Sequence, residues 1–473
     1  MAVARWMTAA WALPLLVLAS SCRGAPAVRG SAALDASRVM SEVRDRTRAD
    51  GDTASLATSA SSRLAAGPLD VGSAVEIALA FNPTVREGYE RLGIARADLV
   101  QAGLLANPML DLGIKRFPAG TEIEGGLVAP VVDLFRMPIR RRIAASRQRA
   151  VEAEVARDVV GLVYDVRRAF LVVHEARAIV KLRSDALEAA KASLSLMESL
   201  HDAGNTLDQN RTIEAIGAAR AALDLEAARS DEAEAVEDLV RLLALEEPPG
   251  ALEIEGALGT APGEGLDVAD LAARAEGASW DLRALDAAVC AARQDAALVT
   301  RDRAMWLRDA GLVGKRDHGE SAVGVGPHVG LELPVFDSGR TARARSAAVV
   351  RQLLAQRDAR RLDVRSAARR LEARVRLLLD RERVLREQYL PERNQLVKDI
   401  LDRYSMMQVG AFEVLEAKGH ELDARREHVQ TLAAAWRARL DVEELLAGRL
   451  NDGMVSRAGL PMEPEHPHTA GGH

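Results

Sequence analysis

Residues 321–350 read SAVGVGPHVGLELPVFDSGRTARARSAAVV, and the pattern of the chain changes near Phe336. Before Phe336, apolar residues alternate with small or polar ones, which is the period of a β-strand. Between Arg340 and Leu390 the sequence contains neither Pro nor Gly and is rich in Ala, Arg and Leu, a composition that favours helix. The stretch therefore predicts a short strand that leads directly into a helix of unusual length.

The predicted strand has two different faces. The apolar face consists of Val323, Val325, Val329, Leu331, Leu333 and Val335. The opposite face is small or polar and consists of Ala322, Gly324, Gly326, His328, Gly330 and Glu332. This alternation is typical of a strand in a transmembrane β-barrel. It is equally typical of a half-buried strand in a soluble sheet, and both interpretations stay open on the strand alone.

The chain repeats itself with a shift of 197 residues. The segment that starts at Leu69 aligns without a gap with the segment that starts at Leu266, and both begin Leu-Asp-Val. An Ala-Arg pair and the Asp that follows also recur, ending at Asp98 and Asp295. We therefore predict the following divisions: a first repeat at 69–246, a linker at 247–265, a second repeat at 266–448 and a flexible tail at 449–473.

Each predicted repeat contains a helix, a β-hairpin, a long helix and a last helix. In the first repeat these are a helix at 72–106, a strand at 109–117 with a partner that ends at 132, and helices at 138–201 and 209–246. The second repeat has helices at 267–304, 338–403 and 411–447, with a kink expected at Pro391. Apolar Leu371, Val375 and Leu378 suit a coiled-coil-like seam.

Helix length and strand number together restrict the architecture. A helix of about 65 residues is close to 100 Å long, which is more than a globular domain of this size holds. Four strands per chain cannot close a barrel, because about eight are the minimum. Three chains would supply twelve strands, enough for an aqueous lumen.

The N-terminus, MAVARWMTAAWALPLLVLASSC (1–22), has a basic residue, an apolar segment and then small residues. This pattern predicts a secretory signal at 1–21 rather than a spanning helix, followed by a leader at 22–68. The segment before Cys22 resembles the bacterial lipobox, so Cys22 is the predicted lipidation site. The alternative is an ordinary cleaved signal with an incidental cysteine. The other cysteine, Cys290, lies in an apolar helical pattern and is predicted to pack in the core.

Composition argues against nucleic acid and against catalysis. The net charge is -6, with no basic excess on the scale of a domain to neutralise phosphates. The segment 324–330 (GVGPHVG) has one residue too many for a dinucleotide-binding loop. Motifs typical of phosphate-binding loops, zinc proteases and serine hydrolases are absent from the sequence. We therefore expect no enzyme activity and no cofactor.

Three stretches resemble the TolC-like outer-membrane efflux proteins, in their lipoprotein form. They are LDVGSAVEIALAFNPTVREGYERLGIARADLVQAGLLANPML (69–110), GPHVGLELPVFDSGRTARARSA (326–347) and RYSMMQVGAFEVLEAKGHELDAR (403–425). The resemblance implies a mainly α-helical fold with a small β part, assembled as a homotrimer. Each protomer would give four strands to a 12-stranded barrel in the outer membrane and its helices to a periplasmic α-helical tunnel.

The resemblance also implies partners and a location. The protein would sit in the outer membrane, in contact with its lipid, and extend into the periplasm. There it would dock on a periplasmic adaptor and an inner-membrane pump, and act as the exit duct of a tripartite efflux system.

Residue roles carry over at matching positions. In the family, a tyrosine and acidic residues near the second helix turn form the periplasmic constriction. Tyr404, Glu413 and Glu416 match them, and Asp208 is the nearest carboxylate at the first turn. Met407 stands where the family has glycine. The alternative for the carboxylates is simple stabilisation of a helix start by the macrodipole. Strand residues expected to face the lumen are His328, Glu332, Asp111 and Lys115.

The substrate is less constrained. VVDLFRMPIRRRIA (131–144) and the stretch at 403–418 resemble the heavy-metal efflux branch, so metal ions or small toxic compounds are the expected cargo. Polypeptide secretion through a similar duct is the alternative, and a lipid-anchored periplasmic adaptor is a further one. The tail histidines His466, His468 and His473 suit a borderline metal, although a solvated tail explains them equally.

Overall fold

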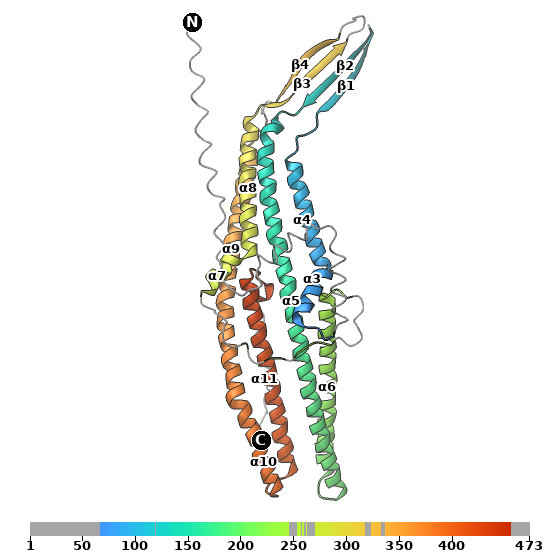
Figure 1. The fold of residues 1–473 in the computed structure, drawn as a ribbon, viewed down its shortest axis with the longest axis vertical. Coiled ribbons are helices and arrows are strands. Elements are labelled where there is room, and N and C mark those ends of the chain that lie inside the picture. Colours follow the sequence, from blue (N-terminus) through green and yellow to red (C-terminus); the bar gives the residue numbers. More distant parts are fainter. Residues whose placement is uncertain are drawn as a thin grey trace, which may run out of the picture. The chain divides into compact units, whose positions relative to one another are not determined.

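The computed structural model describes residues 67–118, 120–245, 253–256, 258–259, 262, 270–316, 323–332 and 336–455. The described residues fall into two compact units. The first unit comes from the described residues within 95–150 and 285–356, and the second from those within 67–94, 151–284 and 357–455. Helices α4 (Pro83–Ala102), α5 (Val132–Asp202), α8 (Trp280–Ala304) and α9 (Arg340–Val384) each contribute residues to both units (Figure 1).

The first unit contains a four-stranded antiparallel sheet. Its strands are β1 (Met109–Phe117), β2 (Gly120–Ala129), β3 (Leu307–Arg316) and β4 (Gly324–Leu331), and they pair in chain order. The structure confirms the predicted fold class, mainly α-helical with four strands, and the predicted bounds of β1. Strand β3 was not located by the sequence analysis. Strand β4 ends at Leu331, so Glu332 follows the strand and does not belong to it.

The helical part of the first unit has a small core of its own. Ile139 and Ile143 of α5 pack on Ala291 of α8, with Leu298 beside them. The predicted start of α5 at 138 was six residues late, because the helix begins at Val132 and contains Pro138. Pro lacks the N–H that would bond to the carbonyl four residues earlier, a loss that matters least near a helix start.

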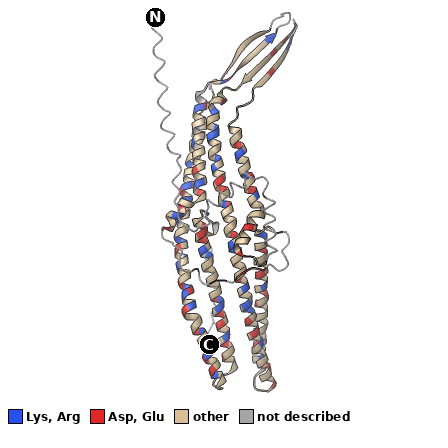
Figure 2. Ribbon diagram, viewed as in Figure 1, with Lys and Arg blue, Asp and Glu red and all other residues tan. Residues whose placement is uncertain are grey.

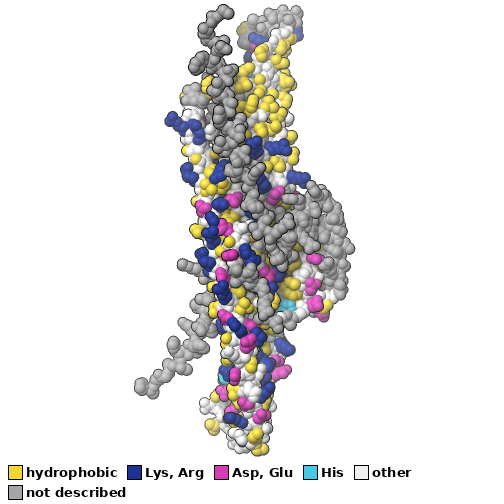
Figure 3. All heavy atoms as spheres, turned by 60° about the vertical axis from the view of Figure 1, so that its left-hand side comes forward, with side chains coloured by type: hydrophobic (Ala, Val, Ile, Leu, Met, Phe, Trp, Pro, Cys, Tyr) yellow, Lys and Arg dark blue, Asp and Glu magenta, His cyan; other side chains and the backbone are white. Residues whose placement is uncertain are grey.

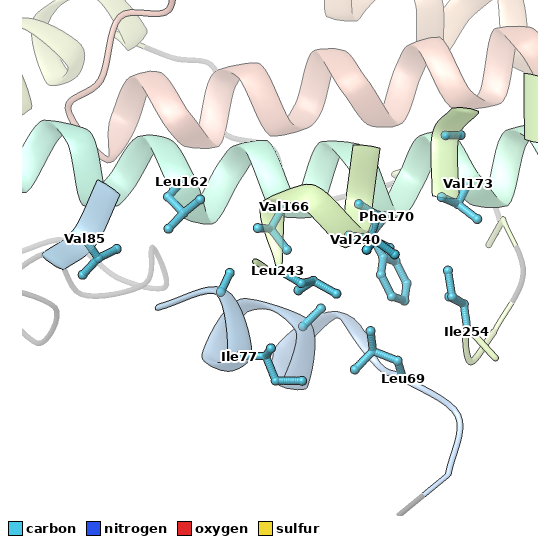
Figure 4. Close-up of a cluster of buried hydrophobic side chains, with 14 residues drawn as sticks. Leu69, Ile77, Val85, Leu162, Val166, Phe170, Val173, Val240, Leu243 and Ile254 are labelled. Atoms are coloured by element: carbon cyan, nitrogen blue, oxygen red, sulfur yellow. The ribbon is translucent and has the colours of Figure 1, made fainter. Parts of the chain in front are cut away.

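The second unit is built on two hydrophobic clusters, one for each half of the chain. The first cluster joins α3 (Val71–Phe81), α5 and α6 (Asp208–Leu242), and Ile254 closes it (Figure 4). The second cluster joins α7 (Leu271–Ala278), α9 and α11 (Ala411–Leu446), with α12 (Asp452–Val455) at its edge. Leu371 and Val375 are buried in this second cluster, and Leu378 packs against it.

The helix that opens each half is broken in two, which the sequence analysis did not predict. Asn82 separates α3 from α4, and Ser279 separates α7 from α8. These two residues are 197 positions apart, the same shift that aligns the two halves of the sequence. The side-chain oxygen of Asn82 accepts from the backbone N–H of Thr84 (2.9 Å) and caps the new helix.

The long helix of the second half also changes its winding once. Leu385–Tyr389 form a π-helical turn between α9 and α10 (Leu390–Ser405). Pro391 lies in the first turn of α10, where its missing N–H removes an ordinary α-helical hydrogen bond. The structure shows a wider turn just before Pro391, and the kink expected at Pro391 itself stays a prediction.

Candidate functional site: the sheet and the helix turns

One face of the sheet is apolar and exposed. Leu110, Leu127, Leu312 and Pro327 lie opposite one another across the four strands. In the rows beside them Leu112 is 70%, Ile114 75% and Val325 68% exposed. Figure 3 shows hydrophobic side chains gathered over the strands. A single chain thus leaves in solvent a continuous apolar surface of the kind that soluble monomers avoid.

The opposite face carries charges that are matched across strands. Lys115 Nζ lies 2.9 Å from Glu124 Oε2, and Lys315 Nζ lies 3.3 Å from Glu122 Oε2. Nearer the helices, His328 Nε2 lies 3.3 Å from Asp309 Oδ1. Such pairs stabilise a face that meets water and would be costly in hydrocarbon.

Three of the four predicted lumen residues share this charged face. The register puts Asp111 in one row with Gly126, Val313 and Gly326, and it puts Lys115 and His328 on the same side. The fourth, Glu332, lies just past β4 and pairs with Arg308 of β3. The structure thus brings Asp111, Lys115 and His328 to one surface, and whether that surface lines a lumen stays a prediction.

Where the strands join the helices, one aspartate ties the elements together. Asp302 near the end of α8 forms ion pairs with Arg136 of α5 and with Arg308 of β3, the latter at 3.1 Å. Asp133 at the start of α5 forms an ion pair with Arg140 of the same helix (3.6 Å). The contacts of Asp302 fix the end of β3 relative to α5 and α8 within the first unit.

In the second unit, the two helix turns lie at the same level. Helices α5 and α11 are antiparallel, because Arg167 pairs with Glu443 (2.9 Å) and Glu175 pairs with Arg437 (3.0 Å). From the second of these contacts about 40 Å of helix leads along α5 to Asp202, and the same length leads along α11 to Ala411. The α5–α6 turn and the α10–α11 turn are therefore at the same end of the unit.

Ion pairs between neighbouring helices stabilise the helices that lead to each turn. Arg177 and Arg183 of α5 pair with Glu232 (3.2 Å) and Asp224 (3.1 Å) of α6. On the other side, Arg381 of α9 pairs with Glu427 of α11 (2.8 Å). The buried Glu382 forms an ion pair with Arg386 (3.2 Å) and lies 3.3 Å from His428. These contacts align the helices that carry the turns.

The predicted gate residues lie at these turns. Tyr404 is at the end of α10 and 47% exposed, and Glu413 is in the first turn of α11. The Glu413 carboxylate folds over Gly410, because a Cβ added there would lie 2.9 Å from Glu413 Oε2. Glu416 is exposed and lies 3.9 Å from His420. Their role in a constriction stays a prediction, since it depends on an assembly.

The first turn has one carboxylate in a comparable place. Asp208 opens α6 and pairs with Arg211 at 2.8 Å. The hydrogen bond and the charge of Arg211 hold the pKa of Asp208 below its usual value. Met407 at the second turn has a φ of 59° and is 94% exposed. The glycine of the family is therefore missing at a position with left-handed backbone, where glycine would be least strained.

The sequence analysis missed a buried charge cluster in the second unit. Glu444 of α11 is fully buried and accepts from Arg168 of α5 and from Arg449, both at 2.6 Å. Desolvation raises the pKa of Glu444, and the two guanidinium charges oppose that rise. Arg449 lies against Gly161, because a Cβ added there would come within 2.6 Å of its guanidinium. Only Gly161, which interrupts an otherwise helical run, gave a local sign of this packing.

Other expected features lie outside the described residues or have no counterpart among them. Cys22, His466, His468 and His473 lie outside the described ranges. Within those ranges, no three His, Cys, Asp or Glu side chains are grouped so that they could hold a metal ion. In the same part of the chain, no helix has both the length and the apolar character needed to cross a bilayer. Cys290 is partly buried in α8, with its Sγ 3.3 Å from Gln294 Nε2.

Sequence comparison finds no matching family model and no matching curated protein. Solved structures, in contrast, match the fold. The outer-membrane channel OprN matches with a TM-score of 0.64 and 22% identity, over 80% of this chain and 90% of that chain. CusC, whose crystal structures concern conformational changes during folding and transmembrane channel formation, matches with a TM-score of 0.62 and 16% identity. The match covers 80% of this chain and 92% of that chain. The outer membrane protein VceC of Vibrio cholerae matches with a TM-score of 0.63 and 18% identity, over 80% and 97%.

These matches cover most of each solved chain, with TM-scores between 0.62 and 0.64. Identities of 22% or less support a statement about fold and leave activity to be tested. The chain has the TolC-like fold of the outer-membrane channel proteins.

Proposed function

We propose that this protein is the outer-membrane exit duct of a tripartite efflux system. In this role it conducts substrate passively and catalyses no reaction. The observation that carries the proposal is the two-faced sheet, with Leu112, Ile114 and Val325 exposed on one face and Lys115, Glu122, Glu124 and Lys315 paired on the other. Lipid on the apolar face and water on the charged face satisfy both surfaces.

The proposed assembly is a homotrimer. Strands β1 and β4 each pair with one neighbour among the described residues, so both edges of the sheet need a partner. An open edge is not tolerated in hydrocarbon, since its N–H and C=O groups would have no partners. Three copies would close twelve strands around an aqueous lumen, into which Asp111, Lys115 and His328 would project.

The proposed location and partners follow from this arrangement. The sheet would lie in the outer membrane, anchored in addition by lipid on Cys22 after removal of residues 1–21. The helices would extend into the periplasm. There the α5–α6 and α10–α11 turns of each protomer would meet a periplasmic adaptor linked to an inner-membrane pump.

Planar bilayers test the duct directly. Purified full-length protein should give stepwise, long-lived conductance, and light scattering in detergent should give the mass of a trimer. A monomer without conductance would overturn the proposal and would favour a lipid-anchored periplasmic adaptor.

The proposed gate is formed by Tyr404, Glu413 and Glu416, with Asp208 at the neighbouring turn. Three-fold symmetry would make Glu413 and Glu416, three residues apart on α11, into a ring that favours cations. Glu413→Gln with Glu416→Gln should shift the reversal potential in a salt gradient toward zero. The control is Glu226→Gln with Asp238→Asn, which removes two exposed carboxylates from the middle and end of α6. Equal reversal potentials for wild type and the gate variant would remove these residues from the constriction.

The proposed cargo is heavy-metal ions or small toxic compounds, on the basis of residues 131–144 and 403–418. Deletion of the gene followed by growth on Cu, Zn, Co and Ni salts and on a panel of drugs tests this choice. Sensitivity to metals alone supports the metal branch. An unchanged metal profile with loss of a secreted polypeptide would instead favour a protein secretion duct.

A further inference from the structure

We propose that arginines of the first unit, on the helix ends next to the sheet, bind the phosphate groups of anionic phospholipids in the adjoining leaflet. The proposal rests on the outer-membrane location proposed above and adds a lipid class to it. We define the arginine collar as Arg141 and Arg142 of α5 with Arg340 and Arg345 of α9.

Positive charge is concentrated at these helix ends. Residues 132–150 contain six arginines and one acidic residue, and residues 340–356 contain four arginines and no acidic residue. The whole chain carries a net charge of -6, so the concentration is local. Figure 2 marks these basic residues on α5 and α9 next to the strands. A local basic surface of this kind attracts anions.

The collar is exposed and unpaired. All four of its side chains are exposed, and none forms an ion pair with an acidic residue in the described part of the chain. Their neighbours differ, because Arg136 and Arg140 on the same helix contact Asp302 and Asp133. The collar arginines therefore have guanidinium donors available, and a guanidinium binds a phosphate with two parallel hydrogen bonds.

Helix stability does not explain the position of Arg340, the collar residue at the start of α9. Helix α9 begins with Arg340 and has no acidic residue in its first turn. The partial positive charge at a helix N-terminus repels basic side chains and attracts anions. An anion placed between the helix start and the guanidinium groups would turn this repulsion into attraction.

Exposed aromatic residues lie between the strands and the collar. Phe135 is 58%, Trp306 61% and Phe336 fully exposed, and each stands within a few residues of a strand end. Aromatic residues of membrane proteins concentrate at the boundary between hydrocarbon and headgroups. The order along the chain at β2 and at β4 is thus apolar strand, aromatic residue and then arginine, which is the order of depth in a leaflet.

The spacing fits the phosphate layer. Along α5, Arg141 lies about 9 Å beyond Phe135, and the polar layer of one leaflet is about 5–8 Å deep. A long arginine side chain can reach back by several ångströms toward the membrane surface. The collar therefore meets lipid phosphate, and a net negative lipid such as phosphatidylglycerol should bind better than a zwitterionic one.

Lipid selectivity measured with spin labels tests the proposal. Full-length protein is reconstituted in phosphatidylcholine vesicles with spin-labelled phosphatidylglycerol or spin-labelled phosphatidylcholine, and the motionally restricted fraction is measured. The collar variant is Arg141→Gln, Arg142→Gln, Arg340→Gln and Arg345→Gln. The control variant is Arg220→Gln, Arg229→Gln, Arg241→Gln and Arg376→Gln, which removes four exposed arginines of the second unit.

Wild type and the control variant should prefer phosphatidylglycerol, by about fivefold for each basic residue that contacts it. The collar variant should lose that preference and keep its conductance in neutral bilayers. Equal restriction of both labels by wild type, or an unchanged preference in the collar variant, would overturn the collar. Absence of conductance from wild type in every bilayer would instead overturn the proposed duct, whichever lipid it prefers.

Discussion

The ends of α6 and α11 have the same backbone geometry and opposite surroundings. Just past each helix, Ala244 and Gly448 adopt left-handed backbone, with φ of 55° and 97°. In both cases the next residue, Leu245 or Arg449, donates its N–H to the carbonyl five residues earlier, at 3.3 and 3.1 Å. This is the Schellman closure of a helix.

The side chains at matching places differ in chemistry. Four residues before the left-handed residue, the first half has Val240, buried in the cluster that α3, α5 and α6 share. The second half has Glu444 at that place, buried between Arg168 and Arg449. The comparison teaches that one backbone ending serves two kinds of interior, and that the residue one turn earlier decides between an apolar and a charged contact.

The largest effect is expected when the buried carboxylate near the end of α11 is replaced by an apolar side chain while its arginine partners stay. Glu444→Val should lower the free energy of unfolding by about 3–5 kcal/mol, because it removes two hydrogen bonds between charged groups at a buried site. Adding Arg168→Leu and Arg449→Leu should restore only part of that loss, since Asp165 and Asp441 would then lose their arginine partners. Denaturant unfolding of matched samples measures both. A triple variant no more stable than Glu444→Val would mean that the charges also set the local structure.

The second effect concerns the two left-handed residues. Gly448→Ala should cost about 2–3 kcal/mol, since its Cβ would lie 2.4 Å from the Ala278 carbonyl oxygen and the backbone is left-handed. Ala244→Gly should change stability in the opposite direction, by about 1 kcal/mol, because glycine carries no penalty there. Thermal unfolding of the pair is the measurement. A stable Gly448→Ala would show that the end of α11 can move away from α7.

A third comparison uses the helix turns. Gly204 and Met407 occupy the same left-handed place after α5 and α10, with φ of 74° and 59°. Met407→Gly should raise stability by about 1 kcal/mol, and Gly204→Met should lower it by a similar amount. The melting temperatures of the two variants should therefore move in opposite directions. A drop for Met407→Gly would indicate that its exposed side chain is held by contacts outside a single chain.

The smallest effect is a pH dependence of stability that comes from His174 of α5, beside the hydrophobic cluster of the first half. His174 packs on Phe170, with ring centroids 5.0 Å apart, and burial together with the charge of Arg177 lowers the pKa of His174 below 6.5. Because the unfolded chain then takes up the proton first, stability is full above pH 6.5 and falls as pH drops toward the folded pKa. His174→Gln should remove that part of the acid-induced loss, as seen in melting temperatures above and below pH 6.5. Parallel curves for both proteins would contradict this.

Much of the fold could be predicted because it depends on local patterns. The alternation at 109–117 and the residues free of Pro and Gly after Arg340 specify strand and helix without reference to partners. The break at Asn82 had a local signal as well, since Pro83 disfavours helix at the residue before it. The break at Ser279 had a local signal in the serine, whose Oγ accepts from the backbone N–H of Leu282 (3.3 Å). Trp280 is also held there by the distant carbonyls of Gly448 and Ala447, both at 2.9 Å, which no local pattern reveals.

The candidate site was predictable to a similar degree. The face shared by Asp111, Lys115 and His328 follows from strand period alone, and the position of Glu413 in a helix start follows from the turn before it. The buried contact of Arg168 with Glu444 joins residues far apart in the sequence, so no local pattern could reveal it.

The π-helical turn of Leu385–Tyr389 adds one residue to the helix that α9 and α10 form together. Its hydrogen bonds close on the fifth residue instead of the fourth, so it holds one residue more than an α-helical turn. Removing one residue there would convert the wider turn into an ordinary α-helical one and leave the facing of α10 nearly unchanged, whereas removing a residue elsewhere in α9 would rotate α10 by about 100° about its axis. The wider turn therefore accommodates one extra residue without changing the direction in which Tyr404 and the α10–α11 turn face.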